Sequence, residues 1–165
     1  MIVFVVLCLG IVAWLFYQKK IVSILDREKL LIWEVIMSNW KYKIDVEDVS
    51  VFDEIEQEYG LQITTKLRDF FVNYNAATPD NCHFVAGGVE KILGAVLSVN
   101  KADTDVDTIY TALPFYDGLV PFGIDPFGNY IAYSVAGGQV VFVNHETEEA
   151  VVVSDSLDAF VNMLY

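Results

Sequence analysis

The chain has 165 residues, 55% of them hydrophobic, and a formal net charge of −13. This length fits one ordinary domain with an appendage, and the hydrophobic content argues against an intrinsically disordered chain. Residues 1–43 have a net charge of +3, whereas residues 44–165 hold 20 acidic and four basic residues, a net charge of −16. A domain this acidic repels nucleic acid and anionic lipid and attracts basic partners, although acidity also serves solubility alone.

The first 18 residues form an uncharged and almost wholly apolar segment. As a helix it would span about 27 Å, slightly less than the bilayer core of roughly 30 Å, so it is a candidate transmembrane helix. Lys19 and Lys20 follow it, and the positive-inside rule would then tether the folded domain to the cytoplasmic face of the membrane. We predict that residues 19–44 form a linker or an amphipathic helix and that residues 45–165 form the folded domain.

An alternative interpretation places the translation start at Met37. The residues from Trp33 to Ile36 can be encoded by a string that contains GGGAGGTGA, a strong bacterial ribosome-binding sequence at a suitable distance from the ATG codon. In that case residues 1–36 are a translated upstream region and no anchor exists. The intact mass of the native protein distinguishes the two interpretations, because a mass that includes residues 1–36 contradicts the later start.

Two amphipathic helices are predicted at the beginning of the domain. The first covers about 46–59, with an aspartate at position 45 or 48 to cap its start and Gly60 to end it. The second covers about 65–74, with Thr64 or Thr65 as the N-cap. In both, apolar residues recur every three or four positions, which predicts one buried face for each helix.

From residue 82 onward, apolar residues alternate as in β-strands, and turn residues separate most of the runs. Asp125, Pro126 and Gly128 stand at the positions that favour them in a type I turn. A short helix or a loop is expected over 104–113. The predicted strands cover residues 82–86, 95–99, 119–124, 129–134, 140–144 and 150–153.

A closing helix is expected to run to residue 164, capped by Ser154 or Ser156. Two helices, then consecutive hairpins, then one helix predict an α+β fold. In this fold a mostly antiparallel β-sheet carries the two N-terminal helices and the C-terminal helix packed on it. A parallel sheet is disfavoured because helices and strands do not alternate along the chain.

Five short motifs in order resemble the SUKH superfamily of Smi/Knr-type domains, over roughly residues 45–164. The strongest is Val-Pro-Phe-Gly-Ile-Asp at 120–125, followed by Gly-Asn at 128–129. The other four are the acidic stretch before Gly60, the helix at 67–75, the strand at 140–145 and the closing helix. The motif residues for which we expect structural roles are Asn75, Pro121, Phe122, Gly123, Asp125, Gly128 and Asn129.

Three positions depart from the pattern of these domains. Ile63 and Thr64 stand where the family has Leu-Pro, so this helix start relies on threonine capping. Two alanines follow Asn75 in place of two glycines, so the backbone of that loop is expected to differ. Asn129 replaces the commoner aspartate.

No catalytic set, metal site or cofactor is predicted. Cys82 and His83 are adjacent on a predicted strand and should point to opposite faces of the sheet. Three alternating aspartates at 103–107 resemble the start of a calcium loop, but position 12 of that loop would be Pro114. We therefore expect that the protein is not an enzyme.

The resemblance implies a bacterial immunity protein that binds and neutralises a cognate polymorphic toxin domain, such as a nuclease. The acidity of the domain suggests that an acidic surface makes the contact, in the cytoplasm. We expect a protein partner, no nucleic acid, and a membrane only if residues 1–18 are genuine; the oligomeric state stays open. The residues expected to contact the toxin lie in predicted loops: Asp103, Asp105, Asp107, Glu146, Glu148 and Glu149.

The sequence leaves two alternative functions. A regulatory or scaffold module, like the eukaryotic Smi/Knr relatives linked to cell-wall synthesis, would be favoured by a genuine membrane anchor. A small hydrolase is disfavoured because no catalytic set converges. Gene order distinguishes immunity from the scaffold function, because an immunity gene is expected directly downstream of a large toxin gene.

Overall fold

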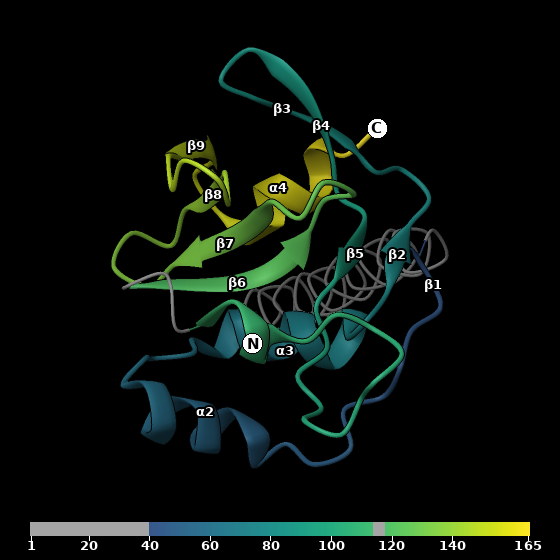
Figure 1. Ribbon diagram of the computed structural model, residues 1–165, viewed down its shortest axis with the longest axis vertical. Helices are drawn as coiled ribbons and strands as arrows, with labels where there is room; N and C mark the ends of the chain where they lie inside the picture. Colours follow the sequence, from purple (N-terminus) through teal and green to yellow (C-terminus); the bar gives the residue numbers. More distant parts are fainter. Residues whose placement is uncertain (1–39, 114–117) are drawn as a thin grey trace, which may run out of the picture. The chain divides into compact units, whose positions relative to one another are not determined.

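The computed structural model describes residues 40–113 and 118–165 (Figure 1). The expected transmembrane helix at 1–18, most of the predicted linker at 19–44 and the alternative start at Met37 lie outside the described residues. Trp40–Tyr165 form one unit by their contacts. None of the described helices is long and apolar enough to cross a membrane.

A five-stranded antiparallel sheet organises the domain (Figure 1). Its strands lie in the order β5 (Ala95–Val96), β6 (Leu119–Ile124), β7 (Tyr130–Ser134), β8 (Val140–Val143) and β9 (Ala150–Ser154). The last four agree closely with the strands predicted from alternating apolar residues. β5 is shorter than the predicted strand at 95–99, because Ser98 forms a parallel bridge with Thr108 instead of extending it.

Two short hairpins accompany the sheet. β1 (Trp40–Lys41) pairs with β2 (Thr78–Pro79), and β3 (His83–Ala86) pairs with β4 (Val89–Ile92). The turn between β3 and β4 uses two glycines, at 87 and 88, with φ of 58° and 79°. β4 was not predicted because Val-Glu-Lys-Ile does not alternate, and β1 and β2 are too short to give a pattern.

Helix α2 (Val51–Tyr59) begins later than predicted. Ser50 is its N-cap but makes no side-chain capping bond. The carboxylate of Asp48 instead accepts a hydrogen bond from Ser50 N at 2.8 Å, which forms a turn before the helix. The prediction that Asp45 or Asp48 caps this helix is therefore wrong. Gly60 ends the helix as predicted, with φ of 66°.

Helices α3 (Thr65–Tyr74) and α4 (Leu157–Met163) begin at predicted caps. The hydroxyl of Thr64 accepts a hydrogen bond from the N–H three residues later at 3.4 Å, and that of Ser156 does the same at 3.2 Å. Threonine therefore caps α3, as predicted. The expected short helix or loop at 104–113 contains the 3-10 helix η1 (Ile109–Thr111).

The buried ring of Phe122 in β6 joins two helices to the sheet. Its centroid lies 5.2 Å from that of Phe70 in α3 and 5.7 Å from that of Phe160 in α4. Because one strand side chain reaches both helices, α3 and α4 cover the same face of the sheet. α2 packs on α3 through Phe52 and Phe71, 6.2 Å apart. The predicted α+β class is confirmed, and Figure 1 shows α2 at the opposite end of the domain from the β3–β4 hairpin.

Candidate protein-binding surface

Asn75, a family-motif residue, is fully buried at the end of α3 and connects three segments. Its Oδ1 accepts a hydrogen bond from Val99 N at 2.8 Å, its Nδ2 donates to Ser98 Oγ at 3.2 Å, and its main-chain oxygen accepts from Ile44 N at 3.0 Å. Ser98 Oγ in turn donates to Asp103 Oδ2 at 2.5 Å. Side chains therefore fix the course of the loop that follows β5.

Asn100 extends this network to the segment before α2. Its Nδ2 donates to the main-chain oxygen of Asp45 at 3.0 Å, and its Oδ1 accepts from Glu47 N at 3.1 Å. Next to it, Lys101 Nζ lies 3.6 Å from Glu58 Oε2 in α2. These contacts place the loop after β5 beside residues 45–47 and beside α2.

The predicted turn at 125–128 is confirmed and is bonded to a second loop. Asp125 Oδ1 accepts from Phe127 N and from Asn129 N, both at 2.8 Å, and its Oδ2 accepts from Asn129 Nδ2 at 2.8 Å. Gly128 adopts φ of 85°, a conformation that favours glycine. Asn129 Oδ1 accepts from His145 N at 3.2 Å, so an amide joins the turn to the β8–β9 loop.

The remaining motif residues shape β6. The register with β7 shifts between Pro121 and Gly123, so β6 carries a bulge at Phe122. Proline supplies no ladder donor and is tolerated at such a bulge. A Cβ on Gly123 would lie 2.6 Å from Leu93 Cδ1, so only glycine fits without a shift. These buried residues determine the packing of β6 rather than contact a partner.

The residues predicted to contact a toxin fall into two separate groups. Asp105 and Asp107 are exposed in the loop after β5. Asp103 is half-buried and accepts the hydrogen bond from Ser98, so the expectation that it is exposed is wrong. Figure 1 shows the β8–β9 connection away from α2 and from the loop after β5. The exposed acids of that connection are Glu146, Glu148 and Glu149.

A larger group of exposed carboxylates surrounds α2. Lys43, Arg68 and Lys101 each form an ion pair with one of them, at 3.4, 2.7 and 3.6 Å. The others make no ion pair with a described residue. We call this group the acidic surface, and it consists of Asp45, Glu47, Asp48, Asp53, Glu54, Glu58, Asp105 and Asp107.

Most of the acidic surface was not predicted from the sequence. Six of its carboxylates lie within residues 45–58 and were visible as a run of acids. Positions 45 and 48 were interpreted as helix caps, and positions 54 and 58 as part of a family motif. Their position beside the loop that carries Asp105 and Asp107 depends on Asn100 and its hydrogen bonds across more than 50 residues, which no periodicity reveals.

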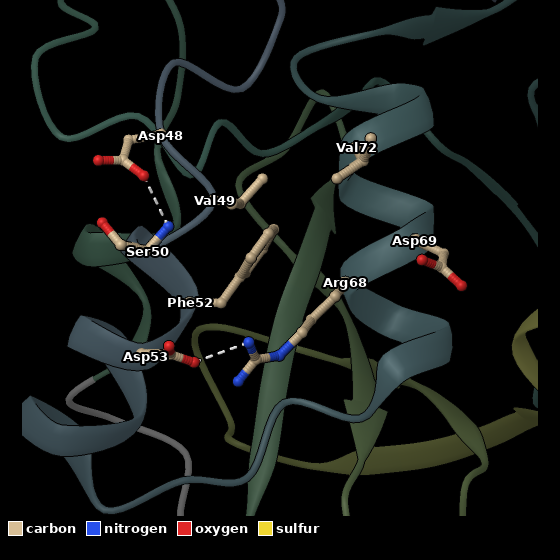
Figure 2. A pocket seen from close by; sticks show the side chains of 8 residues that line it. All are labelled: Asp48, Val49, Ser50, Phe52, Asp53, Arg68, Asp69 and Val72. Carbon is tan, nitrogen blue, oxygen red and sulfur yellow. Dashed lines mark hydrogen bonds and ion pairs between the residues drawn. The ribbon is translucent and has the colours of Figure 1, made fainter.

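A hollow of about 400 Å³ lies between the start of α2 and α3, next to the acidic surface (Figure 2). Figure 2 shows Val49 and Val72 facing the space between the helices, beside the buried ring of Phe52. The carboxylates of Asp48 and Asp69 lie on its two outer sides. The hollow is therefore apolar in the middle and acidic at its edges.

Arg68 borders this hollow, and its charge is already offset. Its Nη1 lies 2.7 Å from Asp53 Oδ1, its Nη2 lies 2.9 Å from Glu56 Oε1, and its Nε donates to the main-chain oxygen of Ile63 at 3.1 Å. Hydrogen bonds from Arg68, and then from Ile63 N, hold the pKa of Glu56 below its ordinary value. The hollow therefore offers negative rather than positive charge to a partner.

Among the described residues, no group of three or more His, Cys, Asp and Glu side chains is arranged to hold a metal ion. The ring of His83 stacks on that of Tyr165, with 5.9 Å between the centroids. His145 Nδ1 lies 3.1 Å from Asn129 Oδ1. Both histidines thus contact side chains of the fold.

One protein family matches most of the described domain. The model of the SMI1 / KNR4 family (SUKH-1) matches residues 47–163. The chain belongs to this family. The match confirms the resemblance carried by the five motifs and extends from the acidic surface to the closing helix. No curated protein and no solved structure matches the chain.

In this SUKH-1 domain, the structural motif residues and the exposed surface are separate. Asn75, Asp125 and Asn129 are buried and bonded within the fold. None of the seven motif residues lines the hollow between α2 and α3. These motif residues therefore act within the fold and lie outside the hollow.

Proposed function

We propose that this SUKH-1 protein is a non-catalytic immunity protein that binds a cognate toxin domain in the cytoplasm and blocks it. Family membership supports a protein-binding role of this kind. The acidic surface carries the proposal, because five of its eight carboxylates make no ion pair with a described residue. These five are Glu47, Asp48, Glu54, Asp105 and Asp107.

Such carboxylates favour a basic partner. A toxin domain that cleaves nucleic acid needs a basic groove for the phosphates, and an acidic protein surface can occupy that groove in their place. Complementary charge also raises the association rate, and dissolved salt screens this effect. We therefore expect the complex to form rapidly at low salt and more slowly at high salt.

The binding kinetics of the purified full chain test the proposal. The partner tested is the C-terminal domain of the protein encoded directly upstream, where an immunity function places the toxin gene, and association is followed at low and at high salt. We expect a stable complex whose association rate falls as salt is added. The absence of binding at every salt concentration would contradict an immunity function and favour a regulatory or scaffold module.

A further inference from the structure

We infer that the hollow between α2 and α3 is the centre of a docking surface for a basic protein. The partner inserts one apolar side chain between the two helices and places lysine or arginine residues against Asp48 and Asp69. The inference rests on the proposed function, and it specifies where the toxin binds and with what chemistry.

The middle of the hollow is suited to an apolar side chain. Val49 is 64% exposed and Val72 is 41% exposed, and both face the ring of Phe52, which is 2% exposed (Figure 2). Binding energy in protein interfaces concentrates where an apolar group enters a well-packed pocket inside a polar rim. A side chain that enters here displaces water from the two exposed valines.

The rim selects a basic partner. Asp48 and Asp69 are exposed on the two sides of the hollow and make no ion pair with a described residue. The cation that borders the hollow, Arg68, already binds Asp53 and Glu56. An acidic partner would therefore face carboxylates on both sides without gaining a free cation, which is a form of discrimination by charge.

The hollow exists before any partner arrives. Arg68 in α3 contacts two carboxylates of α2, and its guanidinium carbon lies 5.6 Å from the centroid of the Phe52 ring. These contacts hold the two helices at a fixed separation. A pre-formed site avoids the free-energy cost of ordering it on binding.

Two matched double variants of the full chain test the inference. Val49→Ser with Val72→Ser alters the hollow, and Val85→Ser with Val89→Ser is the control. The control valines are 44% and 56% exposed and lie on the β3–β4 hairpin, at the other end of the domain from α2 (Figure 1). For the toxin domain we expect the hollow variant to raise Kd at least about tenfold, mainly through faster dissociation. We expect the control to change Kd by less than about twofold.

Equal affinities of the two variants would overturn the inference and leave the immunity function standing, whereas failure of the wild-type chain to bind overturns both. Circular dichroism and thermal unfolding confirm that each variant is folded. Hydrogen–deuterium exchange on the wild-type complex adds a readout that needs no substitution. We expect protection at residues 48–53 and 68–72, and protection confined to another segment, such as 144–149, would contradict the docking site.

Discussion

The carboxylate of Glu56 in α2 lies against the guanidinium of Arg68 in α3, with 2.9 Å between Glu56 Oε1 and Arg68 Nη2. The same oxygen accepts a hydrogen bond from Ile63 N at 2.7 Å. One side chain of α2 thus binds both α3 and the segment that leads into it. The position of α2, and with it the shape of the hollow, depends on this carboxylate.

Glu56→Gln should lower the free energy of unfolding by about 1–2 kcal/mol, because it removes a charge-assisted contact between partly buried groups. Glu54→Gln on the same helix is the matched control, and its exposed side chain predicts a change within about 0.5 kcal/mol. Urea unfolding of both variants measures the difference. An equal decrease in the free energy of unfolding for the two variants would show that Glu56 does not hold α2 in place.

The stability contributed by Glu56 should depend on pH with a definite sign. Because the folded-state pKa of Glu56 is lowered, its contribution is fully present above its unfolded pKa of about 4.3. The contribution is lost as the pH falls through the folded-state pKa. The gap between wild type and Glu56→Gln in free energy of unfolding should therefore be constant at neutral pH and shrink in acid. A gap that widens in acid would contradict this linkage.

Asn75→Ala should destabilise the domain by about 2–3 kcal/mol, because the buried N–H of Val99 would lose its acceptor. Asn73→Ala, two residues earlier in α3, removes only an exposed hydrogen bond to the main chain of Asp69 and should change stability by about 0.5 kcal/mol or less. Thermal unfolding compares the two. A tolerated Asn75→Ala would mean that the loop after β5 is held by other contacts.

Reversing the charges of Asp105 and Asp107 to lysine should slow association with the toxin severalfold and weaken its salt dependence, because both lie on the acidic surface. Glu146 and Glu149 changed to lysine give a control with the same change in net charge, away from α2, and should slow association less. Asp103 is left unchanged because it accepts the hydrogen bond from Ser98. If the variant with lysine at both positions associates as fast as the wild type, the loop after β5 is not part of the docking surface.

Local chemistry explains what the sequence made predictable. Thr64, Ser156 and Gly60 act within one helical turn, and the turn at 125–128 is closed by a single aspartate. Each of these features is determined by neighbours in sequence, so residue type and spacing suffice to identify it.

Contacts between distant residues explain what the sequence did not show. Asp103 looked like an exposed loop acid, yet its burial depends on Ser98, which Asn75 orients from the end of α3. α2 starts late because Asp48 forms a turn before the helix. An aspartate at this position is equally typical of a helix cap, so its residue type does not distinguish the two roles. The hollow combines residues of α3 with the start of α2 and the segment just before it, and only their packing brings Val49 and Val72 together.

Growth rescue tests the central claim most directly. A bacterial host expresses the C-terminal domain of the protein encoded directly upstream, where an immunity function places the toxin, with or without the full chain. An inactive variant of that domain controls for the burden of expression. An immunity function predicts that growth is restored when the full chain is present. Continued arrest of growth, with both proteins soluble and the full chain in excess, would contradict it.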